Sequence, residues 1–387
     1  MLDYDESPKI FSSIKRFLLN PVFKKHEIFF FFTFLITIIF GCKKSNDANI
    51  TTNTPVAPTE NYYYPPLAGD VWATKTAVSI GLDEALLQQA FDFAGTKNTF
   101  GLIILQHGKI VKEQYWNNWT KDTRYYIASA GKSVVGFVTG IAQQDGILNI
   151  NNKTSQYLGT GWTSLPPAKE NLITVKSQLT MTTGLDDGVP DQDCTAATCL
   201  VYKADAGTRW AYHNAPYHLL QNVLAAASNK TFNAYCKEKL FDKIGMPNAQ
   251  WFNYVMYCTT REASRFGSLI LSKGKWNGVA LLNDDAYFSA MTNTSQNYNL
   301  SYGYLWWLNG KASTMVPQSQ VVFPVSLVPN APNDMYMALG KDDKKIYVIP
   351  SLDAVVVRLG DGAGTTTLGP SSFDNELWAK LKPAMHY

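Results

Sequence analysis

The chain has 387 residues, of which 46% are hydrophobic and 13% aromatic, and its formal net charge is +3. This length and composition suffice for one large domain or two smaller ones with a sizeable core. So small a charge does not favour nucleic acid or an anionic surface as the partner, and we expect a small-molecule substrate.

A charge-free apolar run over residues 28–41 follows two lysines and ends at Cys42. It is short for a membrane-spanning helix but typical of the apolar region of an export signal, and its last residues resemble a bacterial lipobox. We therefore predict an export signal over residues 1–41, lipidation of Cys42 and a polar tether over residues 42–70. This predicts a bacterial lipoprotein, periplasmic or tethered to the outer membrane by its N-terminal lipid; an uncleaved signal anchor is the alternative.

Hydrophobic periodicity predicts the remaining elements in chain order. We expect an amphipathic helix over residues 81–98, a strand hairpin over 100–116 that turns at His107-Gly108, and a helix that begins near Ser129. Residues 149–296 have mostly helical and loop patterns. Strand patterns return at Tyr302, Met335, Lys344 and Asp353, and a final helix is expected around residues 373–381.

Strands at both ends with helices between them predict an α/β (α+β) fold. We expect an antiparallel sheet formed by both termini, flanked by helices, with a helical region inserted. One domain would cover residues 71–387, with the sheet in about 71–125 and 297–387 and the helical region in about 126–296. Within the strand pattern from Tyr302, Trp306 and Trp307 alternate faces, so we expect one in the core and the other beside a cleft.

Ser129 and Lys132 form an S-x-x-K pair at an expected helix start. Residues i and i+3 share a helical face, so Lys132 would project beside Ser129. A serine hydroxyl needs a neighbour to take its proton as it attacks, and a buried lysine with a lowered pKa can do so. The helix N-terminus also offers N–H groups to an oxyanion.

The S-x-x-K pattern alone is weak, because two further copies begin at Ser12 and Ser272. The first copy lies in the basic leader and the second in a polar turn. Only the copy at Ser129 is followed by an apolar helical face. A serine N-cap with an exposed lysine in the first turn is the alternative for this pair.

A second group of candidates is Tyr212-His213-Asn214. The phenol of Tyr212 could take or relay the serine proton if a nearby lysine lowers its pKa, and the amide of Asn214 can donate to a substrate carbonyl and hold the lysine. A packed aromatic before a helix is the alternative for Tyr212. His213 and His218 have no acidic residue at ligand or triad spacing, so we assign them no catalytic role.

Cys194 and Cys199 flank a short Thr/Ala loop, and export permits disulfides, so we expect a local bridge, with free thiols as the alternative. No histidine lies near them, which makes zinc a poor interpretation. The acidic loop 185–193 lacks the pattern of a calcium loop and is expected to be solvated. We expect no metal or cofactor; the pairing of Cys236 with Cys258 and the oligomeric state stay open.

Together these segments resemble the serine β-lactamase and penicillin-binding-protein superfamily, especially its class C-like branch of esterases and 6-aminohexanoate-dimer hydrolases. The resemblance covers about residues 100–360 and depends on the order of its landmarks. These are GLIILQHGKIVKEQYW, IASAGKS, ITVKSQLTMTTGLDDG, GTRWAYHN, LFDKIGMPNAQW, TTREASRFGSLILSKGKWNG, YGYLWWLN and ALGKDDKKIYVIPSLDAVVVRLG.

The resemblance implies a β-lactamase/transpeptidase-like fold and an acyl-enzyme mechanism, with the cleft between the sheet and the helical region. By position it implies that Ser129 is the nucleophile and Lys132 its activator. It makes Tyr212 the general base and later acid, and Asn214 a support for substrate and lysine. The oxyanion hole would combine the N–H of Ser129 with one on the terminal strand.

The terminal strand departs from the family pattern, which usually has K-T-G or H-x-G. We align this motif with Ala338-Leu339-Gly340, so that Lys341 supplies the second N–H donor. The side chain that often contacts a substrate carboxylate is then missing, although Lys341, Lys344 and Lys345 lie close in sequence. In addition, Asp342-Asp343-Lys344 replaces a common G-G-Q.

The resemblance implies a serine hydrolase that cleaves an ester or a small amide. Loss of the K-T-G lysine argues against efficient β-lactam or D-Ala-D-Ala turnover, which remains an alternative. A catalytically silent penicillin-binding or sensor domain is the alternative from another class. An α/β-hydrolase needs a G-x-S-x-G elbow, and residues 127–131 lack its first glycine.

Overall fold

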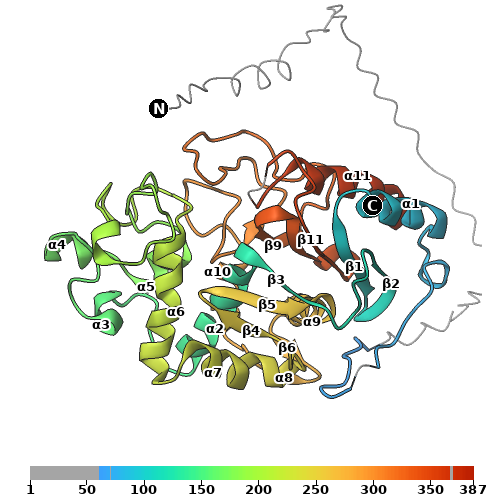
Figure 1. Ribbon diagram of the computed structural model, residues 1–387, viewed down its shortest axis with the longest axis horizontal. Coiled ribbons are helices and arrows are strands. Elements are labelled where there is room, and N and C mark those ends of the chain that lie inside the picture. Colours follow the sequence, from blue (N-terminus) through green and yellow to red (C-terminus); the bar gives the residue numbers. More distant parts are fainter. Residues whose placement is uncertain (1–60, 70, 367–368) are drawn as a thin grey trace, which may run out of the picture. The chain divides into compact units, whose positions relative to one another are not determined.

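The computed structural model describes residues 61–69, 71–366 and 369–387 (Figure 1). The predicted export signal, Cys42 and most of the predicted tether lie outside these residues and stay predictions. Among the residues described, no helix combines the length and apolarity needed to cross a bilayer.

A six-stranded antiparallel sheet joins the two ends of the described chain, in the order β2-β1-β11-β10-β9-β8. The N-terminal hairpin β1–β2 lies next to β11, and β1 pairs with β11 from Thr99 opposite Gly360 to Gln106 opposite Ala354. The antiparallel sheet with flanking helices predicted from the sequence is confirmed. The strands are β1 (Thr99–Gln106), β2 (Lys109–Tyr115), β8 (Trp307–Leu308), β9 (Tyr336–Gly340), β10 (Lys344–Ile349) and β11 (Ala354–Gly360).

Helices cover this sheet, and β9, β10 and β11 are consequently almost entirely buried. Figure 1 shows α1 (Glu84–Gly95) and α11 (Ser372–Met385) together on one side and α9 (Thr260–Leu271) on the other. Polar caps define where these helices begin: Asp83 caps α1, and Thr259 forms a capping box with Glu262 at α9.

The helical region surrounds α2 (Gly131–Gln144), which is buried on every side from Gly131 to Ala142. Its other helices are α3 (Ser155–Leu158), α4 (Pro167–Glu170), α5 (Val175–Leu179), α6 (Asn214–Ser228), α7 (Phe232–Cys236), α8 (Asp242–Ile244) and α10 (Asp285–Met291). A helix in the core is apolar along most of its length, so the apolar residues that follow Ser129 gave a clear signal in the sequence.

Two small sheets draw all their strands except β3 from residues 149–296, for which the sequence indicated helices and loops. One has the order β3-β5-β4, from β3 (Arg124–Tyr126), β5 (Val255–Thr259) and β4 (Gln250–Phe252). The other pairs β6 (Lys275–Trp276) with β7 (Val279–Ala280). Strands this short complete too few alternations to give a sequence signal.

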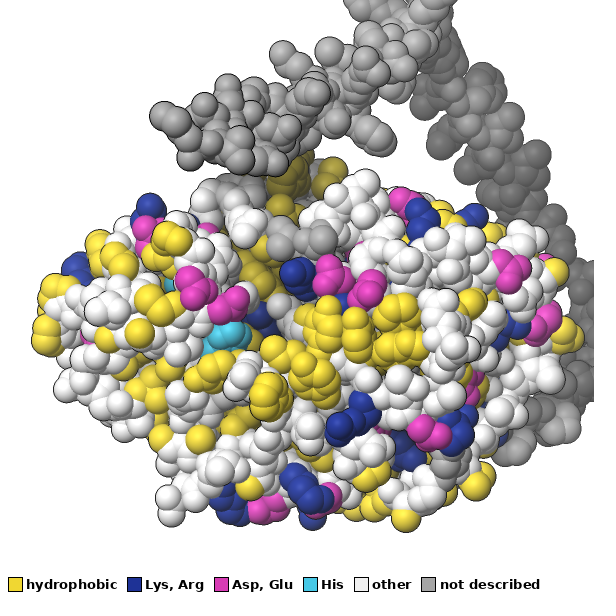
Figure 2. Space-filling view, in the orientation of Figure 1, with side chains coloured by type: hydrophobic (Ala, Val, Ile, Leu, Met, Phe, Trp, Pro, Cys, Tyr) yellow, Lys and Arg dark blue, Asp and Glu magenta, His cyan; other side chains and the backbone are white. Residues whose placement is uncertain are grey.

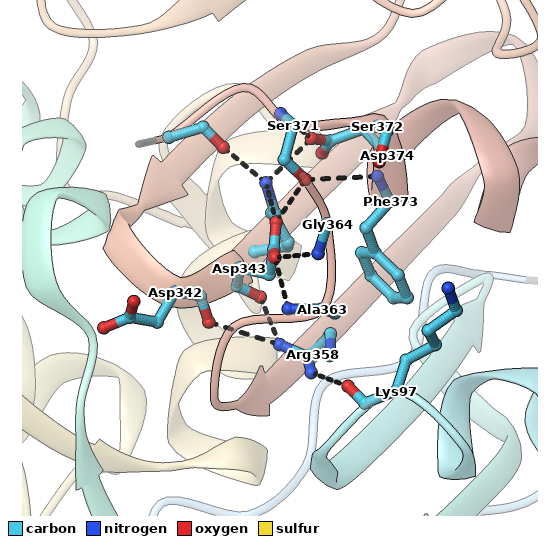
Figure 3. A network of polar contacts seen from close by, with 12 residues as sticks. Lys97, Asp342, Asp343, Arg358, Ala363, Gly364, Ser371, Ser372, Phe373 and Asp374 are labelled. Atoms are coloured by element: carbon cyan, nitrogen blue, oxygen red, sulfur yellow. Dashed lines mark hydrogen bonds and ion pairs between the residues drawn. The ribbon is translucent and has the colours of Figure 1, made fainter. Parts of the chain in front are cut away.

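A buried ionic network connects β10, β11 and the start of α11 (Figure 3). The Nζ atom of Lys345 lies 3.0 Å from Asp343 Oδ1 and 2.8 Å from Asp374 Oδ2, and all three side chains are at most 2% exposed. The Arg358 guanidinium donates to the carbonyl oxygen of Asp343 at 2.7 Å and to those of neighbouring loops. Charges buried in this way must be fully paired, so the network holds the terminal strands in one arrangement.

We expect Asp374→Ala to lower the free energy of unfolding by about 3 kcal/mol, because it leaves the buried Lys345 ammonium short of a partner. The matched control is Glu376→Ala, which removes an exposed pair with Lys97 and should cost less than about 1 kcal/mol. Urea unfolding of both variants measures the difference, and equal costs would contradict a stabilising role for the network.

Candidate active site

Ser129 lies in a tight turn directly before α2. The turn is the 3-10 segment η3 (Ala128–Ala130), and Ala128 has φ 47°, in the left-handed region that non-glycine residues rarely adopt. The N–H of Ile127 donates to the carbonyl oxygen of Met256 at 2.9 Å, which connects the turn to β5. Strain of this kind next to a serine is typical of a functional turn.

Lys132 is buried beneath Ser129, with 2% of the residue exposed. Its Nζ atom donates to Ser129 Oγ at 3.0 Å and to Asn214 Oδ1 at 2.8 Å. Burial lowers the pKa of Lys132 to about 7, although the charge of Asp193 acts in the opposite direction. The alternative of an exposed lysine after a serine N-cap is therefore wrong, and a large share of Lys132 is neutral at neutral pH.

Tyr212 lies beside this pair, with its ring centroid 4.9 Å from Lys132 Nζ. Burial raises the pKa of its hydroxyl above the ordinary value, and a hydrogen bond with Ser129 offsets only part of the rise. The lowered pKa expected from a neighbouring lysine does not occur, because Lys132 itself gives up charge in the same dry surroundings. A phenol in this state favours its protonated form at neutral pH, which suits a proton relay; the general-base role expected for Tyr212 stays a prediction.

The two neighbouring tryptophans are both buried, Trp306 at 0% and Trp307 at 2% exposure. Trp307 stacks on Tyr212 with ring centroids 5.7 Å apart, and Trp306 packs against Phe266. The expectation that one of them borders the cleft is wrong. Trp307 instead holds the ring of Tyr212 in place.

The end of β9 approaches the Ser129 turn very closely. A Cβ atom at Gly340 would lie 2.3 Å from the carbonyl oxygen of Ile127, so only glycine allows this approach. Lys341 follows and lines the cavity in front of Ser129. Lys344 and Lys345, by contrast, are buried and bonded elsewhere, so of the three neighbouring lysines only Lys341 can meet a ligand there.

A cavity of about 460 Å³ brings these residues together. It is visible in Figure 2 as a hollow between the helical region and the three-stranded sheet β3-β5-β4. Ser129, Lys132, Tyr212, Asn214 and Lys341 all line it, as the sequence predicted for a common site. The sequence did not point to the other lining residues, which include Gln192, Asp193, Asn253, Tyr254, Pro317 and Gln318, because they come from loops that only the fold brings near Ser129.

A disulfide joins Cys194 to Cys199, with Cα atoms 5.9 Å apart. It closes the loop that begins directly after Asp193, so it restrains part of the cavity wall. Cys236 and Cys258 are buried free thiols. In the described part of the chain, no group of three or more His, Cys, Asp or Glu side chains is arranged to hold a metal ion.

Both candidate histidines are buried, which lowers the pKa of His213 to about 4 and that of His218 to about 3. They are neutral at neutral pH. His218 lines the cavity, stacks on Tyr254 and has its Nε2 atom 3.8 Å from Asp193 Oδ1. The sequence showed no acidic residue at triad spacing from either histidine. In the structure the Asp193 carboxylate, next to the disulfide loop, approaches the His218 ring, but the distance is too long for a hydrogen bond.

Comparison with known proteins identifies a family and a shared fold. A family model described as Beta-lactamase matches residues 89–314. An uncharacterized protein of Alkalihalophilus pseudofirmus is 21% identical over 306 residues, which cover 68% of this chain and 84% of that protein.

Two solved structures have a similar fold. A putative 6-aminohexanoate-dimer hydrolase from Bacillus anthracis aligns with a TM-score of 0.61 at 14% identity, over 84% of this chain and 90% of that one. A putative beta-lactamase from Bacteroides dorei aligns with a TM-score of 0.61 at 15% identity, over 79% of this chain and all of that one.

The site generates a prediction about Lys132. In a lysine-selective NMR titration, with Lys132→Met used for assignment, one side chain should titrate near pH 7. Asp193→Asn should lower this pKa further, because it removes the charge that favours the ammonium. Asp122→Asn, which affects only the exposed pair with Lys121, should leave it unchanged. If every lysine titrates above about pH 9, the dry environment inferred for Lys132 is wrong.

Proposed function

Because the chain belongs to the Beta-lactamase family, within the serine β-lactamase and penicillin-binding-protein superfamily, we propose that it is a serine hydrolase acting through an acyl-enzyme intermediate. The substrate is an ester or a small amide. The observation that carries the proposal is the contact of a largely neutral, buried Lys132 with the hydroxyl of Ser129 at the cavity wall.

In acylation, Ser129 Oγ attacks the substrate carbonyl carbon as Lys132 Nζ accepts its proton. The N–H groups of Ser129 and Lys341 stabilise the negative oxygen of the tetrahedral intermediate. The proton then passes by way of the Tyr212 hydroxyl to the leaving alcohol or amine as its bond to the carbonyl carbon breaks. Asn214 accepts a hydrogen bond from Lys132 and so fixes the amine relative to Ser129.

Deacylation reverses these roles. A water molecule attacks the acyl-enzyme carbonyl, gives one proton to Lys132 and becomes the acid product, while Ser129 Oγ leaves and takes the proton back. Tyr212 has a raised pKa, which suits a group that passes on one proton as it receives another. Lys132 is thus the base in this proposal, and Tyr212 the relay.

A silent binding domain is the competing function. It has no need for a lysine held in dry surroundings at a pKa of about 7, since burying an ammonium costs stability. Turnover of β-lactams is less favoured, because Ala338 stands where the K-T-G motif of the family has its lysine, so the side chain that often contacts a substrate carboxylate is missing. Lipidation at Cys42 would place this hydrolase at a bacterial membrane, a proposal supported by the sequence alone.

The first test is labelling with a fluorophosphonate. The wild-type protein should be labelled and Ser129→Ala should not. Lys132→Met should slow labelling about 10³-fold and Tyr212→Phe about 10²-fold, because each removes a proton acceptor or relay. The control is Tyr217→Phe, whose ring also lies over Lys132 but whose hydroxyl bonds Gln221 instead; its rate should stay near wild type. A wild-type protein that resists such probes would favour the silent domain.

The second test is the pH dependence of kcat/KM with p-nitrophenyl acetate, with nitrocefin as the β-lactam comparison. The active form needs neutral Lys132, so kcat/KM should rise with pH through an apparent pKa near 7 and level off above it. Asp193→Asn should move this limb to lower pH. A flat profile between about pH 5 and pH 9 would exclude Lys132 as the base.

A further inference from the structure

Five aromatic side chains form a continuous row on the surface beside the cavity. They are Phe100 on β1, Trp119 on the loop after β2, Tyr125 and Tyr126 on β3, and Tyr257 on β5. Each ring contacts the next, with centroids 4.5 Å apart for Phe100 and Trp119, 4.9 Å for Trp119 and Tyr125, 4.5 Å for Tyr125 and Tyr126, and 6.3 Å for Tyr126 and Tyr257. None of the five is fully buried, so they are not core residues.

This aromatic row leads into the catalytic cavity. Tyr126 lines the cavity together with Ser129, and Tyr254 lines it from the turn between β4 and β5. Figure 2 shows hydrophobic side chains gathered next to the hollow, on the side of β3 and the β1–β2 hairpin. A patch of partly exposed rings that continues a cavity is typical of a binding surface.

Carboxylates border the row. The hydroxyl of Tyr125 donates to Asp361 at 2.8 Å, and that of Tyr126 donates to Asp342 at 3.2 Å. Lys344 lies 3.6 Å from each carboxylate, so one ammonium faces two negative charges. The side chain of Asp361 is 50% exposed and is free to accept further hydrogen bonds.

This combination selects the chemistry of the ligand. Asp342 and Asp361 together carry one more charge than the Lys344 between them, so this end of the row is net negative and disfavours phosphate or carboxylate groups, and with them nucleic acids and acidic polymers. A purely apolar chain would leave the same carboxylates desolvated. A neutral sugar fits both features, because its C–H faces lie on the negative faces of aromatic rings and its hydroxyls donate to carboxylates.

We propose that the aromatic row binds the rings of an uncharged glycan, and that the bond cleaved at Ser129 is an ester carried by that glycan. The inference rests on the proposed function for the cleavage step, but not for the binding step. Ser129 takes the acyl group, and the sugar hydroxyl is the leaving group that receives the proton.

Kinetics on two kinds of ester test the proposal. The substrates are three partially O-acetylated hexasaccharides, one built of xylose, one of glucose and one of N-acetylglucosamine, and p-nitrophenyl acetate, which carries no sugar. Trp119→Ala should lower kcat/KM about tenfold for at least one hexasaccharide and leave it within about twofold for p-nitrophenyl acetate. Trp119→Phe, which keeps a ring, should restore most of the loss. Tyr298→Ala, a 40% exposed tyrosine outside the row, is the matched control.

Other outcomes overturn the proposal. If Trp119→Ala affects no hexasaccharide more than p-nitrophenyl acetate, the row does not bind glycans. If it instead selectively reduces hydrolysis of 2-naphthyl or p-nitrophenyl decanoate esters, the row binds apolar groups.

Binding separates failure of the row from failure of the enzyme. If the wild-type protein hydrolyses no ester and takes no fluorophosphonate, the proposed function fails. Calorimetric titration of Ser129→Ala with the unacetylated hexasaccharides then decides on the row alone: binding that Trp119→Ala weakens about tenfold supports it, and no binding overturns it.

Discussion

The arrangement of the site depends on a lysine side chain that is taken out of water beneath a serine. Such a burial costs free energy unless hydrogen bonds and nearby charge density compensate it. Lys132 has Ser129 and Asn214 as hydrogen-bond partners and the rings of two tyrosines close to its Nζ atom. The contact with Asn214 joins the start of α2 to the start of α6. Burial also makes the amine chemically useful, since the same loss of solvent lowers its pKa.

The end of β9 that faces the Ser129 turn belongs to a sheet formed by strands from both ends of the described chain. Strand β9 is held by β10, and β10 by β11, which pairs with the N-terminal strand β1. Gly340 can therefore stand against the Ser129 turn only when the whole sheet is formed. The buried pairs of Lys345 with Asp343 and Asp374 lie at this end of the sheet, and Asp343 follows Lys341 by two residues in the chain.

The sequence allowed the long elements and the position of Ser129 before a buried helix to be predicted, because both leave local signals. The hairpin over 100–116 and the strands from Met335 onward have clear alternation, and Ser129 precedes an apolar helix. The electrostatics of Tyr212 were not predictable, since they depend on burial by Trp307 and other distant residues. Asp193 and Tyr254 were missed for a related reason: they reach the cavity through loops without periodic patterns.

The segment Lys341–Asp343 after β9 connects the buried ionic network to the cavity, although in the sequence it was only a departure from the family pattern. Asp342 and Asp343 both have left-handed φ, at 57° and 59°, so the chain reverses there without the usual glycines. Because of this reversal the carboxylates of Asp342 and Asp343 point to different partners. Asp343 is buried and pairs with Lys345, whereas Asp342 accepts the hydroxyl of Tyr126 at the cavity. A glycine-rich loop would offer neither contact, so this loop both anchors the sheet and holds Tyr126, which lines the cavity.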